Sequence, residues 1–397
     1  MNYFKYFNKI IILIFFSTNL NGYILITDIG GDIDDVFALQ TIFHEQTISD
    51  KNVLPEAIIT THNKPIEKAQ IAKLISIKSG YPNIPVYVGH GLDASYSKQT
   101  FNIDNPLWPA FFGYLNPLEN EKECNPKQGD AYRNVYGTEF DDVQNSLIRG
   151  RDSAIDLLID VAKQHRLNNE KLDIVATGPL HDLYYALLKV KRTDGEEGER
   201  IFADSINLWA MGGDYPAGYN WLIAPHVTDY VLKRIETTCV PSELIRKYAL
   251  NVTTNEFNFF IRCSHKTEFA QAILQDWKNW NEDDQLKNDK NLCDPVTVYL
   301  FLHQEYILSR KLIKTEFTCL DENNEVKAGL RETAYCARYR ENQITNFREI
   351  IDGENSKVSF ICELNNPELL RRKLVHKIAN IFYPGIPEDA FWVTMDF

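Results

Sequence analysis

A short segment near the N-terminus holds four carboxylates within eight residues: Asp28, Asp32, Asp34 and Asp35. Carboxylates packed this closely repel one another unless a cation joins them. Gly30 and Gly31 lie between them and let the backbone adopt positive φ, so that the side chains can turn towards one point. Because all of the candidate ligands are oxygens, the pattern favours a hard cation such as Ca²⁺ or Mg²⁺.

The acidic turn could instead have a purely structural role. It could cap a helix N-terminus, where the helix dipole favours aspartate, but one or two aspartates would satisfy that need. An EF-hand loop is excluded by spacing, since counting from Asp28 places Gly30 at the third position and Leu39 at the twelfth. A metal site of a different kind is the better interpretation.

The residues on either side predict which elements hold the acidic turn. Residues 23–26 (YILI) have the β-branched and aromatic composition of a buried strand. Val36, Phe37 and Leu39 then begin an amphipathic helix. The aspartates therefore lie between the carboxyl end of a strand and the start of a helix.

Alternating apolar and amphipathic segments predict the rest of the fold. Strands are expected at 54–61, 84–88, 172–176 and 206–211, and helices at 65–79, 152–165, 183–190 and 369–381. This alternation indicates an α/β protein with an open, mostly parallel sheet flanked by helices, a Rossmann-like core. Ligands of such sheets bind at the carboxyl ends of strands, where Asn63 and the turn at 177–180 also lie.

Less regular segments carry further expectations. Residues 89–144 lack periodicity and are expected to form an irregular lid or binding loop, or a surface insertion. An apolar helix should begin near Val296, with Asp294 as either its N-cap or a ligand. Residues 281–291 are expected to form a solvated charged loop, and 316–339 a hairpin.

Composition limits the class of protein and of partner. The chain has 397 residues, of which 44% are hydrophobic, with no internal repeat or low-complexity linker. We therefore expect a single domain over residues 23–397. The net charge of −13 argues against nucleic acid and is compatible with a neutral or cationic small molecule. Whether the chain forms a homo-oligomer is left open.

Residues 1–22 have the pattern of a signal peptide. Lys5 and Lys9 precede a short apolar core at 10–16, and small polar residues follow. The apolar run is too short to span a bilayer. We expect cleavage, no membrane attachment afterwards, and a protein that is secreted or retained in a secretory-pathway lumen.

An oxidising compartment bears on cysteines and glycosylation. The chain has 7 cysteines, an odd number, so at least one stays free or pairs between molecules. Cys319 and Cys336 bracket the predicted hairpin and are the first choice for a disulfide. Asn251 begins an Asn-Val-Thr sequon, so the protein is expected to be a glycoprotein.

Five short motifs, in order along the chain, resemble the inosine–uridine-preferring nucleoside N-ribohydrolase family. They are the acidic turn at 26–35, the strand at 58–61 with Asn63, the Thr-Gly-Pro-Leu turn at 177–180, the Met-Gly-Gly at 211–213 with Tyr219-Asn220, and Cys293-Asp294-Pro295. Together they cover most of the chain after residue 22.

The resemblance implies a Ca²⁺-dependent enzyme that cleaves ribonucleosides into free base and ribose. It implies that Asp28 is both the general base and a metal ligand, with further ligands from Asp35, Asp294 and the carbonyl of Thr177. It implies that the ribose hydroxyls bind to Asp34, Asn63 and Asn220.

Departures from the family pattern leave some roles open. The acidic turn has two extra residues, so Asp32 could replace or assist Asp28. Cys293 stands where a histidine that can protonate the leaving base is often found. Trp221 could stack on the base or pack in the core. Gly218 stands where the family often has a glutamate, and this difference weakens ribose binding.

Two rival functions therefore remain. One is a secreted nucleoside- or sugar-binding protein that has lost turnover, which the replaced histidine and glutamate favour. The other is a glycosidase that uses paired carboxylates without a metal, which the density of acids at one turn disfavours.

Overall fold

The computed structural model describes residues 22–30, 32–62, 64–90, 129–150, 152–213, 218–222, 224–264, 267–280, 290–320, 326–329, 344–350 and 356–395. The strands are β1 (Tyr23–Thr27), β2 (Ala57–Thr60), β3 (Val86–Val88), β4 (Leu172–Ala176), β5 (Ile206–Met211), β6 (Glu236–Val240), β7 (Asn251–Val252), β8 (Lys290–Asn291), β9 (Ile307–Leu320), β10 (Val326–Gly329), β11 (Ile344–Ile350) and β12 (Val358–Leu364). The α-helices are α1 (Asp34–Ile48), α2 (Pro65–Lys78), α6 (Asp130–Tyr136), α7 (Thr138–Asp142), α8 (Ser153–Leu167), α9 (His181–Asp204), α10 (Tyr219–Leu222), α11 (Pro225–Leu232), α12 (Ser242–Lys247), α13 (Thr254–Cys263), α14 (Glu268–Trp280), α15 (Cys293–Leu302), α17 (Pro367–Phe382) and α18 (Glu388–Met395). Short 3₁₀ helices span Val143–Ser146 and Gln304–Tyr306.

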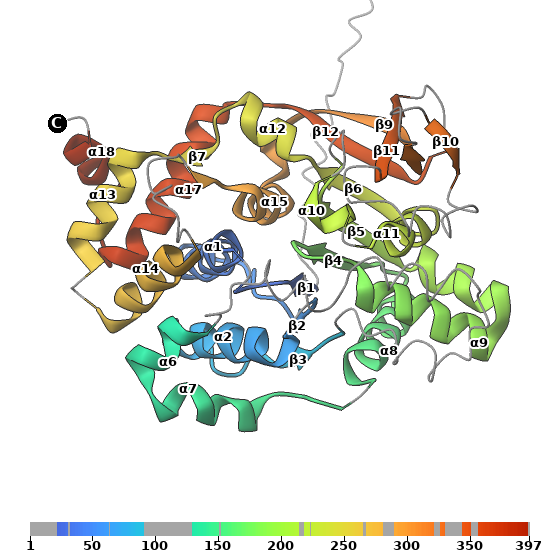
Figure 1. Cartoon of the computed structure of the whole chain (residues 1–397), viewed down its shortest axis with the longest axis horizontal. Helices are drawn as coiled ribbons and strands as arrows, with labels where there is room; N and C mark the ends of the chain where they lie inside the picture. The colour runs from blue at the N-terminus through green and yellow to red at the C-terminus, as the bar shows by residue number, and fades with distance from the viewer. Residues whose placement is uncertain are drawn as a thin grey trace, which may run out of the picture.

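The central sheet has the strand order β9-β12-β6-β5-β4-β1-β2-β3. Every neighbouring pair from β12 to β3 is parallel, and β9 runs antiparallel to β12. Strands β10 and β11 both pair with the far half of β9 (Figure 1). The predicted open, mostly parallel α/β sheet is therefore confirmed.

Alternate side chains of β1 face the two hydrophobic cores. Tyr23 and Leu25 pack in a core shared with residues of α1, α2, α15 and α17. Ile24 and Ile26 point to the opposite face and pack in a core shared with residues of α8, α9 and α11. Burying each such side chain stabilises the fold by roughly 1.5–3 kcal/mol. The continuous apolar run of β1 thus reflects a strand covered by helices on both faces.

The topology places the candidate site at a switch point of the sheet. From β1 the chain proceeds to β2 on one side, and it later returns to β4 on the other side. Thr27 is level with Thr60 of β2, and Ile26 is level with Ala176 of β4. The residues that follow β1, β2 and β4 therefore emerge together at one edge, where ligands of such sheets bind.

Several predicted boundaries were wrong. The strand predicted at 54–61 is β2, which begins at Ala57, and the helix predicted from Val296 begins at Cys293. Within the segment predicted to be irregular, residues 130–142 form α6 and α7, which bury Ala131, Tyr132 and Phe140. The hairpin predicted at 316–339 is confirmed by the antiparallel pairing of β9 with β10 between Thr318 and Gly329, although β9 begins earlier, at Ile307.

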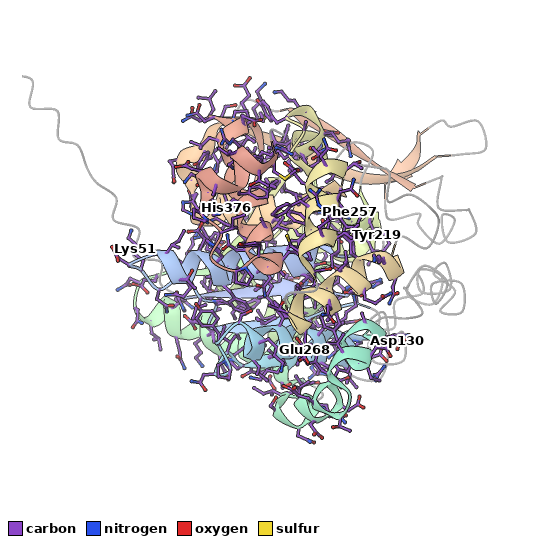
Figure 2. All side chains as sticks on the ribbon, turned by 90° about the vertical axis from the view of Figure 1, so that its left-hand side faces the viewer. Lys51, Asp130, Tyr219, Phe257, Glu268 and His376 are labelled. Carbon is purple, nitrogen blue, oxygen red and sulfur yellow. The ribbon has the colours of Figure 1, made fainter. Side chains whose placement is uncertain are left out.

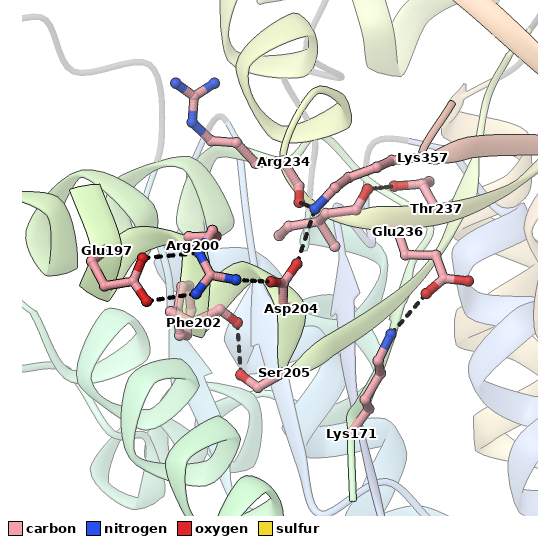
Figure 3. Close-up of polar contacts among 11 residues, drawn as sticks. Lys171, Glu197, Arg200, Phe202, Asp204, Ser205, Arg234, Glu236, Thr237 and Lys357 are labelled. Carbon is pink, nitrogen blue, oxygen red and sulfur yellow. Dashed lines mark hydrogen bonds and ion pairs between the residues drawn. The ribbon is translucent and has the colours of Figure 1, made fainter. Parts of the chain in front are cut away.

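Helix α9 extends well beyond the predicted end at residue 190. Its second half is rich in charged residues and lacks a regular spacing of apolar residues, so the predicted helix end came too early. Gly195, with φ of 74°, interrupts the helical backbone between the two halves. On the second half Arg200 pairs with Glu197 one turn before it and with Asp204 one turn after it (Figure 3).

Ion pairs also join the amino ends of the strands, at the edge opposite the candidate site. The Nζ of Lys171 lies 2.7 Å from an Oε of Glu236, and the Nζ of Lys357 lies 3.0 Å from an Oδ of Asp204 (Figure 3). All four side chains are exposed by two fifths or more. Exposed pairs of this kind contribute about 0–1 kcal/mol each. This edge is an ordinary solvated surface.

Some sequence predictions fall outside the described residues. They include the signal peptide up to residue 21, the segment 91–128, Asn63, Cys336 and the side chain of Cys319. Among the helices that are described, none is both long enough and apolar enough to cross a membrane. The sequon threonine, Thr253, forms a capping box with Glu256 at the start of α13, which gives it a structural role that does not depend on glycosylation.

Candidate active site

A cluster of three buried carboxylates lies where α1 meets α15. Among the described residues, one oxygen from each of Asp34, Asp35 and Asp294 lies within 4.8 Å of the others. Leu292 is the N-cap of α15, and no side chain caps that helix. The prediction of Asp294 as an N-cap is therefore wrong, and the side chain instead faces the acidic turn from a distant part of the chain.

Asp35 is held in place by two threonine hydroxyls. The Oγ1 of Thr27 donates to Oδ1 of Asp35 at 2.5 Å, and the Oγ1 of Thr177 donates to the same oxygen at 2.8 Å. The backbone N–H of Thr177 donates to the carbonyl of Ile26 at 2.8 Å, which extends the β1–β4 ladder by one step. The carbonyl of Thr177 accepts from Nδ2 of Asn220 at 2.5 Å. A carbonyl has a second lone pair, which can bind a cation.

Asp28 sits beside this cluster in a crowded backbone environment. The Nζ of Lys68, a fully buried residue of α2, donates to the carbonyl oxygen of Asp28. A Cβ on Gly178 would lie 2.8 Å from both the backbone N and Oδ1 of Asp28. Glycine at 178 is therefore required for Asp28 to hold its position. Sequence reasoning missed Lys68, although a lysine on a helix face that is otherwise buried is seldom there without a partner.

Asp32 is occupied by the turn and by a lysine. Its Oδ1 accepts from the backbone N–H of Ile33 and, at 3.4 Å, from that of Asp34. Its Oδ2 accepts from Nζ of Lys290, which also lies 3.9 Å from Oδ1 of Asp34. The β7–β8 ladder fixes Lys290 just before α15. Lys290 is mostly buried, so the prediction of a solvated loop is wrong at this residue.

The electrostatics of the cluster call for an added positive charge. Burial raises the pKa of Asp34 to about 7, with Asp32 adding to the effect. Burial and Asp28 likewise raise the pKa of Asp35 to about 7. Burial, Asp34 and Asp35 raise the pKa of Asp294 well above its usual range. Each of these shifts is the cost of holding like charges together out of water.

The donor set fits a hard divalent cation. The donors near the cluster are carboxylate and carbonyl oxygens, the ligand type that Ca²⁺ and Mg²⁺ prefer. A bound dication would neutralise the repulsion that raises the pKa values of Asp34, Asp35 and Asp294. The residues present therefore fit the metal that the acidic turn predicts.

The remaining predicted site residues lie in different settings. Asn220, on α10, reaches the site through its bond to Thr177. Trp221 is 1% exposed and packs with Leu232 and Cys239. Cys293 is the first residue of α15, directly before Asp294.

A model of the family described as "Inosine-uridine preferring nucleoside hydrolase" matches residues 23–370. The chain belongs to this family. It is accordingly a hydrolase acting on N-glycosyl bonds, as the five motifs predicted. No curated protein sequence matches the chain.

Solved structures of two nucleoside hydrolases and of one effector protein share the fold at low sequence identity. A plant nucleoside hydrolase is 16% identical, with a TM-score of 0.56, and the match covers 91% of this chain and 99% of that one. A purine-preferring ribonucleoside hydrolase from Gardnerella vaginalis is 15% identical, with a TM-score of 0.55 and coverage of 91% and 98%. The type III effector XopQ, in complex with adenosine diphosphate ribose, is 14% identical, with a TM-score of 0.55 and coverage of 91% and 94%. At these identities the likeness establishes the fold.

Proposed function

We propose that this nucleoside hydrolase releases free base and ribose from ribonucleosides with the help of Ca²⁺. The observation that carries the proposal is the convergence of Asp34, Asp35 and Asp294 within 4.8 Å at the carboxyl edge of the sheet. In this proposal the metal ligands are Asp28, Asp35, Asp294 and the carbonyl of Thr177. When bound, Ca²⁺ would lower the pKa of a water molecule and orient it at the anomeric carbon.

The chain's own residues hold the ribose and move the proton. Asp34 and the two asparagines, Asn63 and Asn220, hydrogen-bond the ribose hydroxyls. Asp28 accepts the proton of the attacking water, and burial, partly offset by Lys68, raises the pKa of its carboxyl towards the range that suits a general base. Asp32 serves as a positioning residue, because both of its oxygens are already engaged.

Bond cleavage leaves positive charge on the sugar. The buried carboxylates around it stabilise that charge without having to reorganise. This role agrees with the excess of carboxylates over lysines at the site.

The test of the function is the release of ribose from inosine, uridine and adenosine, with and without a chelator. We expect release that stops when the chelator removes the metal and returns with Ca²⁺. Asp294→Ala should lose both turnover and Ca²⁺ binding. Unchanged Ca²⁺ affinity in that variant would contradict the ligand assignment.

A second candidate is a protein that binds nucleosides without cleaving them. Cys293 in the place of a leaving-group histidine favours it. Calorimetric binding of inosine to the protein, with no ribose released from any of the three nucleosides, would support this candidate over the hydrolase.

We also propose that residues 1–22 are removed and that the protein enters the secretory pathway. N-terminal sequencing of protein collected from the medium of expressing cells tests this. A mature chain that still begins at Met1 would contradict it.

A further inference from the structure

A second group of buried polar side chains lies at the same sheet edge: His62, His90, His181 and Asp182. His62 follows β2, His90 follows β3, and the other two begin α9 after β4. The backbone N–H of His62 donates to the carbonyl of His90 at 3.0 Å, and the Nδ1 of His90 lies 2.7 Å from Oδ1 of Asp182. The family's motifs do not account for this group.

Several atoms of this group have no hydrogen-bond partner among the described residues. They are Nδ1 of His62, both ring nitrogens of His181 and Oδ2 of Asp182. The rings of His62 and His181 are nearly parallel, with centroids 6.1 Å apart. An unpartnered buried polar atom costs about 1–3 kcal/mol, so a fold retains several of them together only where water or a reacting group completes them.

One hydroxyl connects this group to the substrate side. The Nε2 of His62 lies 2.9 Å from the hydroxyl of Tyr219, and Tyr219 is 49% exposed. Tyr219 directly precedes Asn220, whose amide contacts the carbonyl of Thr177. Figure 2 shows Tyr219 and Lys51, which follows α1, at opposite sides of the molecule, so this tyrosine belongs to the edge that carries the site.

The backbone of His62 has an uncommon conformation. Its φ is +68°, in the left-handed region that few residues other than glycine adopt. Such a conformation persists where the surrounding structure requires it, most often at functional sites. Burial, with Lys68 adding to the effect, lowers the pKa of His62 well below its usual value, so the ring is neutral.

We propose that Tyr219 protonates the departing base and that His62 restores the proton of Tyr219. This inference rests on the proposed function and supplies the leaving-group acid that Cys293 leaves unassigned. As the bond between C1′ and the base nitrogen breaks, its electron pair goes to the base, and the proton of the Tyr219 hydroxyl joins that nitrogen. Nε2–H of His62 then returns a proton to the tyrosine oxygen while Nδ1 takes up a proton from solvent, which leaves the ring as its Nδ1–H tautomer. Proton exchange with solvent after the products leave returns the ring to the Nε2–H tautomer for the next turnover.

The protons balance over the cycle. The attacking water gives one proton to Asp28, which releases it to solvent, and solvent gives one back through Nδ1 of His62. A neutral imidazole suits this task, because it donates at one nitrogen and accepts at the other. Tyr219 is thus the catalytic residue, and His62 is a positioning residue that acts through it.

The test compares two substrates that differ in their need for an acid. Inosine needs its base protonated as it leaves, whereas p-nitrophenyl riboside releases a stable phenolate. We expect Tyr219→Phe to lower kcat for inosine by ~100-fold or more with little change in KM, the contribution of a general acid. The same variant should keep kcat for p-nitrophenyl riboside within ~3-fold, since that step asks for no proton.

Each result supports or overturns the proposal. Equal loss on both substrates, or no loss on inosine, would overturn it. Wild-type protein that cleaves p-nitrophenyl riboside but not inosine would also overturn it, while leaving hydrolysis at the metal intact. Wild-type protein that cleaves neither would overturn the proposed function and this inference together.

Two further variants test whether His62 relays a proton or has only a structural role. His62→Gln keeps an N–H that can donate to Tyr219 but cannot pass a proton through, so it should show the same selective loss on inosine. Full activity in His62→Gln would reduce His62 to a structural role and contradict the relay. Tyr230→Phe removes a phenol that donates to Glu199 from α11, outside the site, and should leave the ratio of the two substrates unchanged.

Discussion

Helix α1 carries buried carboxylates at both ends, Asp34 and Asp35 in its first turn and Glu45 near its last. An Oε of Glu45 lies 2.5 Å from Nζ of the buried Lys377, and His303 lies 3.3 Å from the other oxygen. Burial raises the pKa of Glu45, but His303 and Lys377 outweigh it and lower the pKa to about 2. At the first turn the pKa values of Asp34 and Asp35 instead rise to about 7.

The contrast separates a structural site from a functional one. Lys377 and His303 of the same chain pair with Glu45, so its negative charge is compensated as soon as the protein has folded. The first-turn aspartates share Lys290 with Asp32 and are held together by threonine hydroxyls, which leaves negative charge uncompensated. Clustered carboxylates with raised pKa values are typical of sites that await a ligand.

The largest expected effect follows from Asp35→Asn. We expect kcat/KM to fall by about 1,000-fold, because a metal that stabilises the transition state by several kcal/mol loses a ligand. Without metal the variant should be at least as stable as the wild type, because one repelling charge is gone. Steady-state kinetics measure kcat/KM, and thermal unfolding in chelator measures the stability without metal. Activity within tenfold of wild type would show that this end of α1 is not the functional one.

Glu45→Gln tests the other end. Breaking a buried pair leaves Lys377 unpaired and should cost about 3–5 kcal/mol in urea unfolding. Activity per folded molecule should not change. Glu139→Gln is the control, because Glu139 pairs with Lys78 on the surface, and its loss should cost no more than about 1 kcal/mol. A Glu45→Gln variant that stays stable but loses turnover would reverse the comparison.

The two ends should respond to pH in opposite directions. The folded pKa values of Asp34 and Asp35, about 7, lie above the ordinary value of 3.8, so the metal-free fold gains stability as pH falls from 8 towards 5. The folded pKa of Glu45, about 2, lies below its ordinary 4.5, so its contribution is lost as pH falls below 4.5. Urea unfolding in chelator should therefore show maximum stability near pH 5. Asp35→Asn should reduce the loss of stability between pH 5 and pH 8. Stability that rises steadily from pH 5 to 8 would contradict the assignment.

The smallest effect concerns Lys290. Its ammonium partly neutralises Asp32 and Asp34 and repels an incoming dication. Lys290→Gln should therefore strengthen Ca²⁺ binding by ~10-fold, a modest electrostatic change for a partly screened charge. Calorimetric titration with Ca²⁺ measures it. Weaker binding in the variant would mean that Lys290 mainly orders the carboxylates.

Local pattern was enough to predict β1 to β5 in order, but it did not predict β6 and β12, which complete the parallel part of the sheet. The strands at 172–176 and 206–211 were predicted with the bounds that the structure has, because both are short apolar runs between clear turns. The length of α9 was not predictable from apolar periodicity, because its second half buries only Phe202 and Ala203 as apolar residues and is otherwise rich in charged ones. The burial of Lys290 depends on the ladder between β7 and β8, two strands of two residues each that are too short to leave a pattern.

The site was predictable in part for a related reason. Asp35 and Asp294, two of the predicted ligands, come together with Asp34, which was predicted to bind ribose, because strand-end motifs share one sheet edge. The positions of Lys68 and Tyr219 depend on contacts between distant segments. The hydrogen bond between His62 and Tyr219 joins residues that are 157 positions apart, so the sequence around either residue could not predict it. The roles of Asn63 and of the 91–128 segment stay predictions.

The strand order also governs when the site can form as the chain is made. Strand β1 lies at the centre of the sheet, yet its neighbour β4 begins only at Leu172, and Asp294 comes later still. At a synthesis rate of about 5–20 residues per second, Asp35 waits tens of seconds for its partner on α15. Until then the emerging chain contains the acidic turn but lacks the carboxylate of α15 that completes the cation site. Metal affinity is therefore acquired late in synthesis, and a bound ion indicates a molecule in which β1, β4 and α15 have already assembled.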